Sequence, residues 1–451
     1  MTDAVPAGGG AQALPVPGPV PPLRVGRVAR ARLGNGVEVM VVPHPSVPRV
    51  ELRLTVPAGA AIGVSAAAAE LLRAGMVLGT RELDQEQLSE QIQNLGGSLQ
   101  VHQDQDRLQI SAAALAEAEE DLYRLLGQLV AAPYFPAPEL EIEKVKLIEG
   151  LRMARATPQF PAIERLQQLL YGRHPYGRRE PSEAAVARVN REQLRQLHGR
   201  SFAPGATQIT VVGQVEPRRT QRWLERFFGQ RRGATHPPAL PALRRPGPTA
   251  GVSFIDRPGS VQTVILAGVS APPQGHPDHL PLSLAAAVLG GSFSCRLMAN
   301  LREDKGYTYG AHARAHGHLL DTMLAVESEV RTEVTAAAYA EMSYELARLS
   351  TVEVGREELE RTRTYMSGAR LVMLQTQAGL AGALAQLRAQ GLDHRYLEQY
   401  AKRLGRVSAA ELRRAAARYL APTALTTVMV GDARQALAGL RPLAAVRRTR
   451  A

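Results

Sequence analysis

Three histidines near residue 315 are the first candidates for chemistry, because they recur at even spacing. His312, His316 and His318 lie in YGAHARAHGH, residues 309–318. On a straight strand this spacing puts all three imidazoles on one face, where they are open to a metal ion. Adjacent members would nevertheless lie ~7 Å or more apart, too far to share one zinc ion without ligands from elsewhere. We therefore interpret the cluster as a polar sheet face.

Arg302 and Tyr309 form a second candidate, seven residues apart in GGSFSCRLMANLREDKGYTYG, residues 290–310. A guanidinium or phenol aimed at a carbonyl oxygen stabilises negative charge that develops on that oxygen. Arginine also grips a carbonyl or carboxylate group with a permanent charge. The structural alternative is a strand that starts after a helix, with Arg302 in an ion pair to Glu303 or Asp304 and Tyr307 or Tyr309 packed on the sheet.

The segment SAAAAELLRAGMVLGT, residues 65–80, has helical spacing and ends at a Gly-Thr that indicates a stop. One of its faces carries Glu70, Arg73 and Ala74. Zinc needs about three protein ligands to hold and activate a water molecule. Alanine supplies none, and a permanent guanidinium repels a dication at close range. We therefore expect no metal here, and a solvated or salt-bridged helix face for Glu70 and Arg73.

Composition excludes several other classes of function. Cys295 is the only cysteine, so the chain has neither a disulfide framework nor a cysteine-based zinc site. The net charge is +12, but we expect no nucleic-acid partner because the sequence holds no finger, zipper or basic-aromatic motif. GGSFS lacks the Lys-Ser/Thr ending of a phosphate loop. No apolar run is long enough for a membrane span.

The elements that must position these residues occur twice in the chain. RVNREQLRQLHGRSFAPGATQITVVG (residues 188–213) aligns without a gap over RVSAAELRRAAARYLAPTALTTVMVG (residues 406–431). In both copies Asn190 or Ser408 caps an amphipathic helix, a proline breaks it, and a β-branched strand ends at glycine. A strand, turn and strand followed by a helix precede each copy, as does a pair of alternating strands.

This repetition predicts an α+β fold with two homologous α/β domains, each a mixed sheet covered by helices, that form a clamshell half-chamber. The expected divisions are a disordered Pro/Gly-rich leader at 1–24, domains at 25–230 and 250–435, a linker at 231–249 and a basic tail at 436–451. The start of the chain shows no basic n-region or continuous apolar segment, so cytoplasm is the default location, with the periplasm still open.

The chain resembles the pitrilysin/insulinase family of zinc peptidases, whose smaller members include the mitochondrial processing peptidase subunits. The resemblance covers nearly all of the chain after the leader. It rests on the Gly-Thr ending of residues 65–80, on YGRHPYGRREPSEAAVARV and LHGRSFAPGATQITVVGQV, on IDRPGSVQTVILAG, and on residues 290–310. The last segment is the most specific, because its Arg302 and Tyr309 match the family's C-terminal signature.

In active members the N-terminal helix carries His-x-x-Glu-His, which places two imidazoles on one face beside a glutamate that acts on metal-bound water. Anchored on the Gly-Thr ending, these positions are Glu70, Arg73 and Ala74 here. The family's further acidic ligand falls on Glu149 or Gly150, and the sequence does not decide between them.

The resemblance therefore implies a non-catalytic subunit of a heterodimeric zinc peptidase. Some bacterial members divide the site between two chains, one with zinc and the other with the Arg/Tyr pair. We expect this chain to supply Arg302 and Tyr309 to a homologous zinc-bearing partner, to contact a peptide substrate, and to hydrolyse nothing alone. The alternative is a peptide-binding or scaffold member of the family with no catalytic role.

Overall fold

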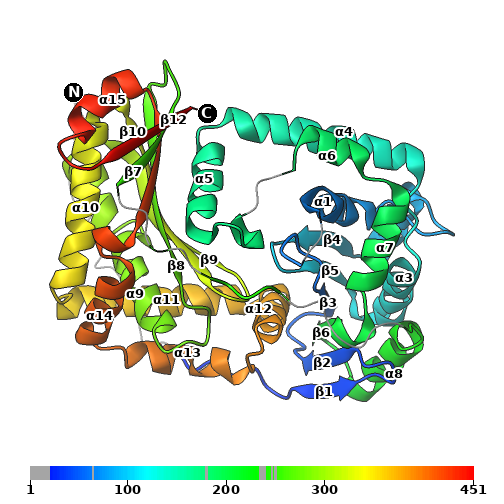
Figure 1. Ribbon diagram of the computed structural model, residues 1–451. Coiled ribbons are helices and arrows are strands. Elements are labelled where there is room, and N and C mark those ends of the chain that lie inside the picture. The colour runs from blue at the N-terminus through cyan, green and yellow to red at the C-terminus, as the bar shows by residue number, and fades with distance from the viewer. Residues whose placement is uncertain are drawn as a thin grey trace, which may run out of the picture.

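The computed structural model describes residues 21–62, 65–177, 181–232, 240–244, 247 and 251–450. These residues form two α/β halves (Figure 1), which we call the N half (up to residue 232) and the C half (from residue 251). The expected α+β fold with two similar halves is confirmed. None of the helices in the described segments is both long and apolar enough to cross a bilayer.

Each half is built on a six-stranded mixed sheet. The N sheet has, in spatial order, β1 (Ala29–Arg32), β2 (Glu38–Pro43), β6 (Gln208–Gly213), β3 (Arg49–Val56), β5 (Leu108–Leu115) and β4 (Ser98–Gln103). The C sheet has β12 (Val446–Arg450), β7 (Val252–Asp256), β11 (Thr426–Gly431), β8 (Gln262–Ala271), β10 (Thr322–Arg331) and β9 (Thr308–Gly317). In the N sheet β6 pairs parallel with β2 and antiparallel with β3, and in the C sheet β11 pairs in the same way with β7 and β8.

The two sheets differ at one edge, and this difference corrects an expectation. In the N sheet the edge strand β1 precedes β2 and runs antiparallel to it. In the C sheet β12 comes from the end of the chain and runs parallel to β7. The interpretation of residues 436–451 as a basic tail is therefore wrong for residues 446–450, because the free edge of β7 offers backbone partners to this segment.

The helices follow the same duplicated plan. The N half contains α1 (Ala66–Gly75), α2 (Gln85–Asn94), α3 (Glu119–Ala131), α4 (Ala137–Ala156), α5 (Gln159–Tyr171), α6 (Glu183–Arg188), α7 (Arg191–Ser201) and α8 (Pro217–Phe228). The C half contains α9 (His279–Gly290), α10 (Thr335–Thr351), α11 (Arg356–Leu374), α12 (Gln377–Ala389), α13 (Arg395–Gly405), α14 (Ala409–Tyr419) and α15 (Ala433–Leu440). The expected caps are confirmed, since Asn190 and Ser408 each complete a capping box at the start of α7 and α14.

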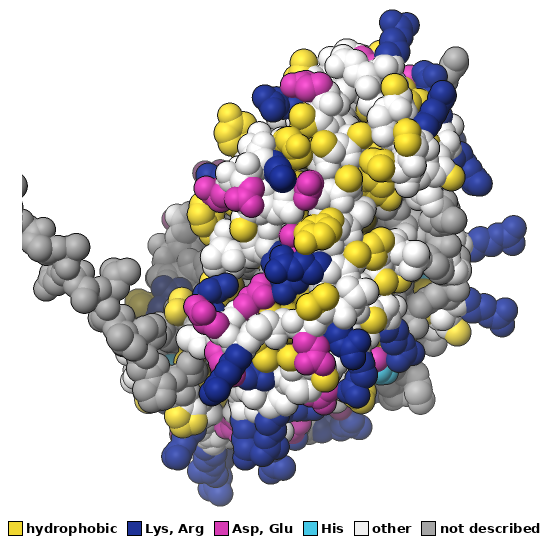
Figure 2. All heavy atoms as spheres, turned by 90° about the vertical axis from the view of Figure 1, so that its left-hand side faces the viewer, with side chains coloured by type: hydrophobic (Ala, Val, Ile, Leu, Met, Phe, Trp, Pro, Cys, Tyr) yellow, Lys and Arg dark blue, Asp and Glu magenta, His cyan; other side chains and the backbone are white. Residues whose placement is uncertain are grey.

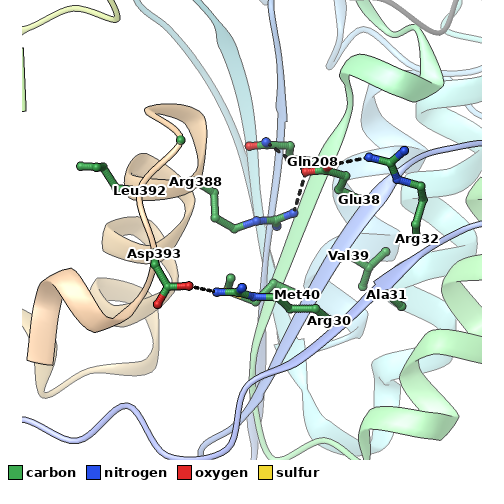
Figure 3. A pocket seen from close by; sticks show the side chains of 11 residues that line it. Arg30, Ala31, Arg32, Glu38, Val39, Met40, Gln208, Arg388, Leu392 and Asp393 are labelled. Atoms are coloured by element: carbon green, nitrogen blue, oxygen red, sulfur yellow. Dashed lines mark hydrogen bonds and ion pairs between the residues drawn. The ribbon is translucent and has the colours of Figure 1, made fainter. Parts of the chain in front are cut away.

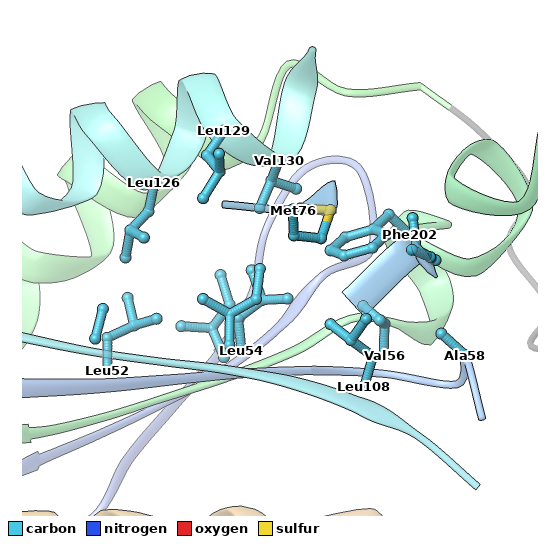
Figure 4. Packing of buried hydrophobic residues seen from close by; sticks show 14 of the residues in the cluster. Leu52, Leu54, Val56, Ala58, Met76, Leu108, Leu126, Leu129, Val130 and Phe202 are labelled. Atoms are coloured by element: carbon cyan, nitrogen blue, oxygen red, sulfur yellow. The ribbon is translucent and has the colours of Figure 1, made fainter. Parts of the chain in front are cut away.

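One face of each sheet packs on helices of its own half. In the N half, alternate side chains of β3 (Leu52, Leu54 and Val56) point into a core that includes Met76 of the turn after α1 and Phe202 after α7 (Figure 4). The corresponding core of the C half lies between its sheet and the helices α9, α10, α14 and α15. Alternation along each strand thus leaves a second set of side chains for the opposite face.

The opposite faces are covered by an exchange of helices between the halves. Helix α5 of the N half lies on β8 and β11 of the C sheet, and helix α12 of the C half lies on β3 and β6 of the N sheet (Figure 1). Leu166 and Leu170 on α5 pack against Val264 and Leu266 of β8. The two halves are therefore interlocked through their cores, in addition to their chain connection.

The expected leader and linker lie only partly within the described residues. Residues 1–20 and most of 231–249 fall outside them. Of the described part, Leu23 packs against the core beneath α12, and Leu240 and Leu243 pack against the core beneath α5. Both segments thus contribute side chains to the junction between the halves.

The positive charge is distributed among acidic groups on the face that Figure 2 shows. On this outward face of the C half, basic, acidic and apolar side chains are interspersed, with basic side chains dense along the lower rim, where Figure 1 places α13. Many arginines of the described segments form ion pairs with nearby carboxylates, such as Arg348 with Glu345 and Arg413 with Glu353. This face of the C half carries no continuous field of one sign.

Candidate functional site

The degenerate zinc-motif positions lie on α1 and are occupied by an internal ion pair. Arg73 Nε lies 3.1 Å from Glu70 Oε2, one helical turn away, and both side chains are about one-third exposed. The expectation of a salt-bridged helix face is thus confirmed. Ala74 follows on the same helix and contributes only a methyl group. Arg73 uses the one carboxylate that this turn could offer to a cation.

The second acidic candidate is engaged in the same way. Glu149 on α4 accepts a hydrogen bond from Arg152 at 2.7 Å, and Arg152 also pairs with Glu183 of α6 at 2.6 Å. Gly150, the other candidate, has no side chain. Within the segments that the structure describes, no group of three or more His, Cys, Asp or Glu side chains is placed to hold a metal ion. The residues at the family's zinc position therefore do not fit the metal.

Arg302 lies on a seven-residue π-helix, η4 (Met298–Asp304), which leads directly into β9. Helices of this kind are rare and occur frequently at functional sites. The η4 turn is fastened to α10 because Asn300 donates to Glu341 and Glu345 at 3.0 and 3.2 Å. The segment before it is fastened to α11 by a two-point ion pair of Arg296 with Glu358. The backbone that carries Arg302 is thus held from two sides.

The guanidinium of Arg302 has three neighbours. It donates to the backbone oxygen of Tyr309 at 3.2 Å, lies 3.3 Å from Glu303, and stacks 4.9 Å from the ring centre of Phe293. The expected ion pair with Glu303 is confirmed. Tyr307 packs against the C-half core, as a structural strand start would require.

Tyr309 behaves differently from Tyr307. Its side chain is 89% exposed, and no group in the described residues binds its phenol. The structural alternative, which packs Tyr307 or Tyr309 on the sheet, is therefore met by Tyr307 and not by Tyr309. Phe293, on which the Arg302 guanidinium stacks, is 65% exposed. Arg302 thus contacts both the Phe293 ring and the Tyr309 backbone, and both aromatic side chains are exposed.

A glycine fixes the distance between this cluster and the helix behind it. A Cβ atom at Gly290, the last residue of α9, would lie 2.3 Å from the backbone nitrogen of Ala313 on β9. Any side chain there would push β9 away from α9. The first glycine of the GGSFS segment thus serves close packing.

The structure does not bring the Arg/Tyr pair to the degenerate zinc helix within one chain. A hollow of about 470 Å³ is lined by Glu70 of α1, Asp104 of the β4–β5 turn, and residues 315–318 at the far end of β9. Tyr309 lies six residues earlier on β9, which places it ~20 Å from that end. Glu70 therefore lies near the C-terminal end of β9, whereas Tyr309 lies near its N-terminal end.

Two of the three histidines lie on β9 and the third directly follows it, and His316 and His318 line the same hollow. His312 and His316 lie on β9, opposite Glu327 and Met323 of β10, whereas His318 follows the strand. The chain turns there, and His318 is buried against Tyr176, with ring centres 4.3 Å apart. Burial lowers the pKa of His318, which favours the neutral ring.

His318 belongs to a polar joint between the halves that sequence reasoning missed. Tyr176 donates its hydroxyl to Asp106 at 2.6 Å, and the backbone of Leu319 donates to the same carboxylate at 2.8 Å. Burial raises the pKa of Asp106 despite these bonds. The joint combines three separate segments, those of Asp106, Tyr176 and His318, so no local spacing could have indicated it.

Comparisons with known proteins agree with this architecture. A sequence model of the family described as Peptidase M16 inactive domain matches residues 188–366. The crystal structure of a peptidase M16 inactive domain from Pseudomonas fluorescens superposes with a TM-score of 0.81 at 22% identity, over 90% of this chain and 98% of that one. A protease from Helicobacter pylori gives 0.83 at 17% identity, over 90% and 100%. At these identities the two structures establish the fold.

Curated relatives carry the name of uncharacterised zinc proteases. One from Mycobacterium leprae is 25% identical over 293 residues, which are 63% of this chain and 65% of that protein. One from Mycobacterium bovis is 25% identical over 42% of this chain, and the match spans 44% of its length. YmxG of Bacillus subtilis is 22% identical over 77% of this chain and 85% of its own. The chain is therefore similar to the M16 peptidases, in sequence over residues 188–366 and in fold over most of its length, and it lacks the His-x-x-Glu-His motif at Glu70, Arg73 and Ala74.

Proposed function

We propose that this chain is the non-catalytic subunit of a heterodimeric zinc peptidase and supplies Arg302 and Tyr309 to a site whose zinc is bound by the partner. The partner would resemble this chain in fold and carry His-x-x-Glu-His on the helix that corresponds to α1. Cytoplasm stays the proposed location.

The observation that carries this proposal is the exposure of Tyr309. Because Tyr309 is 89% exposed, it contributes little to the stability of its own half. Arg302, which binds its backbone oxygen, lies on the π-helical turn that α10 holds in place. Tyrosine and arginine are the residue types that most often supply binding energy when a partner covers them. The cluster is therefore suited to complete a site that another chain begins.

In such a site the two side chains would bind the oxygen of the scissile carbonyl. A phenol O–H and a guanidinium N–H can both donate to that oxygen as it gains charge, and a water-excluding cleft strengthens both bonds. Zinc on the partner would supply the activated water. This chain would contribute donors and orientation, and no metal ligand.

Free sheet edges could position the substrate. β4 is the outermost strand of the N sheet and β9 that of the C sheet, so the outer edge of each has no strand neighbour within the described residues. An extended peptide can add to such an edge through backbone hydrogen bonds. Because β9 begins beside Tyr309, a peptide on it would pass the Arg/Tyr cluster.

The test is to express this chain and its homologous zinc-bearing partner separately and together, and to assay each preparation on a peptide library. We expect cleavage by the mixture, and none by this chain alone or by the partner alone. Activity of this chain alone, or full activity of the partner alone, would contradict the proposal. Metal analysis of this chain should show no stoichiometric zinc.

A scaffold or peptide-binding role without any part in catalysis is the second candidate. It is favoured by the local partners of Arg302, because Glu303, Phe293 and the Tyr309 backbone already satisfy much of the guanidinium. In that case the mixture would cleave peptides no faster than the zinc-bearing partner does alone. The same assay thus separates the two candidates.

A further inference from the structure

A cationic hollow lies at the junction of the halves, away from the Arg/Tyr cluster. It has a volume of about 520 Å³ between strands β1 and β2 of the N sheet and the segment that follows α12. Arg30 and Arg32 reach it from β1, and Arg388 reaches it from α12. Figure 3 shows Arg32 and Arg388 approaching Glu38 from opposite sides, with the pair of Arg30 and Asp393 beside them.

The charges that line this hollow do not balance. Three guanidiniums share two carboxylates. Arg30 pairs with Asp393, whereas Glu38 is shared by Arg32 at 2.9 Å and Arg388 at 3.8 Å. Among the described residues, Arg388 therefore has no carboxylate closer than that of Glu38 at 3.8 Å, which Arg32 already binds. An anion in the hollow would supply the missing negative charge.

Arg388 is the cation with the weakest compensation. Its side chain is 10% exposed, and its close acceptors are neutral, the backbone oxygen of Ile209 at 2.7 Å and the hydroxyl of Thr210 at 2.9 Å. Burial lowers the pKa of this guanidinium to about 10, against the opposing effect of Glu38 and with a smaller contribution from the charge of Arg30. Removing a cation from water without a close anion is costly. A ligand carboxylate beside Arg388 would offset that cost.

A more apolar hollow adjoins this one. It has a volume of about 350 Å³, shares Glu38 and Gln208 with the first, and has Ala389, next to Arg388, in its wall. Its lining also includes the charged residues Asp106 and Arg107, and its apolar part comes from Val56, Pro57, Ile62, Leu240, Leu319 and Leu320. A ligand that fills both cavities needs an anionic end and an adjoining apolar part.

We propose that this paired cavity binds the C-terminal carboxylate of a peptide, with the terminal carboxylate among Arg30, Arg32 and Arg388 and an apolar side chain in the adjoining cavity. A forked guanidinium matches a carboxylate in two-point geometry, and the apolar cavity gains from covering aliphatic groups. The site would recognise a free chain end. The inference needs neither zinc nor a partner chain, so it is independent of the function proposed above.

The test is calorimetric titration of the full chain with the peptide N-acetyl-Ala-Leu-Leu as the free acid and as the C-terminal amide. We expect the free acid to bind at least tenfold more tightly than the amide. The double substitution Arg30→Gln/Arg32→Gln should weaken the free acid at least tenfold. A control with two exposed arginines elsewhere, Arg124→Gln/Arg226→Gln, should leave it unchanged.

Substitution of Glu38 gives a prediction of opposite sign. Because Glu38 competes with the ligand for Arg32 and Arg388, Glu38→Gln should tighten binding of the free acid several-fold. Equal binding of acid and amide, weaker binding to the Glu38→Gln variant, or tight binding of inorganic phosphate without binding of the peptide would each overturn the proposal. Arg388→Lys retains the charge but loses the fork, and should weaken binding of the free acid.

Discussion

The two sheets receive their exchanged helices on chemically different faces. Positions on β3 and β8 correspond through their pairing with the repeated strands β6 and β11. On the C sheet, α5 meets Val264, Leu266 and Gly268. On the N sheet, α12 meets the corresponding side chains of β3, which are Glu51, Arg53 and Thr55.

The polar face is organised around a buried ion pair. Arg53 lies 3.0 Å from Glu51 and also donates to the backbone oxygen of Ala378 on α12 at 3.2 Å. The apolar face instead allows close approach, because a Cβ atom at Gly268 would lie 2.7 Å from a methyl group of Leu166. The same exchange is thus held by directional hydrogen bonds on one side and by steric fit on the other.

Removal of one charge from the polar face should have the largest effect on stability. Arg53→Leu leaves Glu51 buried and unpaired, and we expect it to lower the free energy of unfolding by about 3–5 kcal/mol. Denaturant titration measures this loss. Retention of full stability would show that solvent reaches Glu51 and that the pair is not buried.

The double substitution Glu51→Val/Arg53→Leu copies the C-half residues and sharpens the comparison. Removal of both charges should recover most of the loss, because the desolvation cost disappears together with the attraction. A double variant no more stable than Arg53→Leu would show that the hydrogen bond to α12 matters more than the charges.

The apolar face should respond to the loss of volume. Leu166→Ala removes a fully buried side chain from α5, and the resulting cavity should lower the free energy of unfolding by about 3 kcal/mol. Ile163→Ala, on an exposed position of the same helix, is the matched control and should change it little. Equal effects of the two substitutions would contradict the assigned packing.

Acid should destabilise the N half through a histidine that the C half lacks. Burial, with the nearby charge of Arg231, lowers the pKa of His198 to about 3, and Ala416 occupies the repeated position. The unfolded chain binds the proton with a pKa near 6.5, so stability is complete above that value and decreases as the pH falls towards 3. Between pH 7 and 5 the wild type should lose ~2 kcal/mol of its free energy of unfolding through His198, and the His198→Phe variant should not show this loss. Identical pH slopes in both proteins would refute this assignment.

The smallest effect is expected at the former zinc helix. Glu70→Ala breaks a part-exposed ion pair one turn apart, which contributes only about 0.2–0.5 kcal/mol. Circular dichroism during denaturant titration would measure it. A loss of several kcal/mol would show that Glu70 still has a structural partner beyond Arg73.

Local features of the fold were readable from the sequence because each depends on neighbours in the chain. Asn190 and Ser408 predicted helix starts through their own capping bonds, and the alternating segments near 97–114 and 309–330 predicted the strand pairs β4–β5 and β9–β10. The exchange of α5 and α12 could not be predicted. The apolar stripe of a helix shows that it is buried, and not which sheet covers it.

The site was predictable only in part for the same reason. That Glu70, Arg73 and Ala74 cannot hold a zinc ion follows from their residue types alone. The place of His318 depends on a turn that carries it off β9 into contact with Tyr176. The cationic hollow joins Arg30 to Arg388, which are far apart in the sequence, so no motif could indicate it.

The most direct measurement is the turnover of the reconstituted pair with Arg302→Ala in this chain. Loss of one donor to the developing oxyanion should lower kcat by about 10²–10³-fold. Arg314→Ala, which removes a partly exposed arginine from the neighbouring strand β9, should leave kcat within twofold. Equal turnover of the Arg302→Ala and wild-type pairs would contradict the claim that this chain completes the active site of its partner.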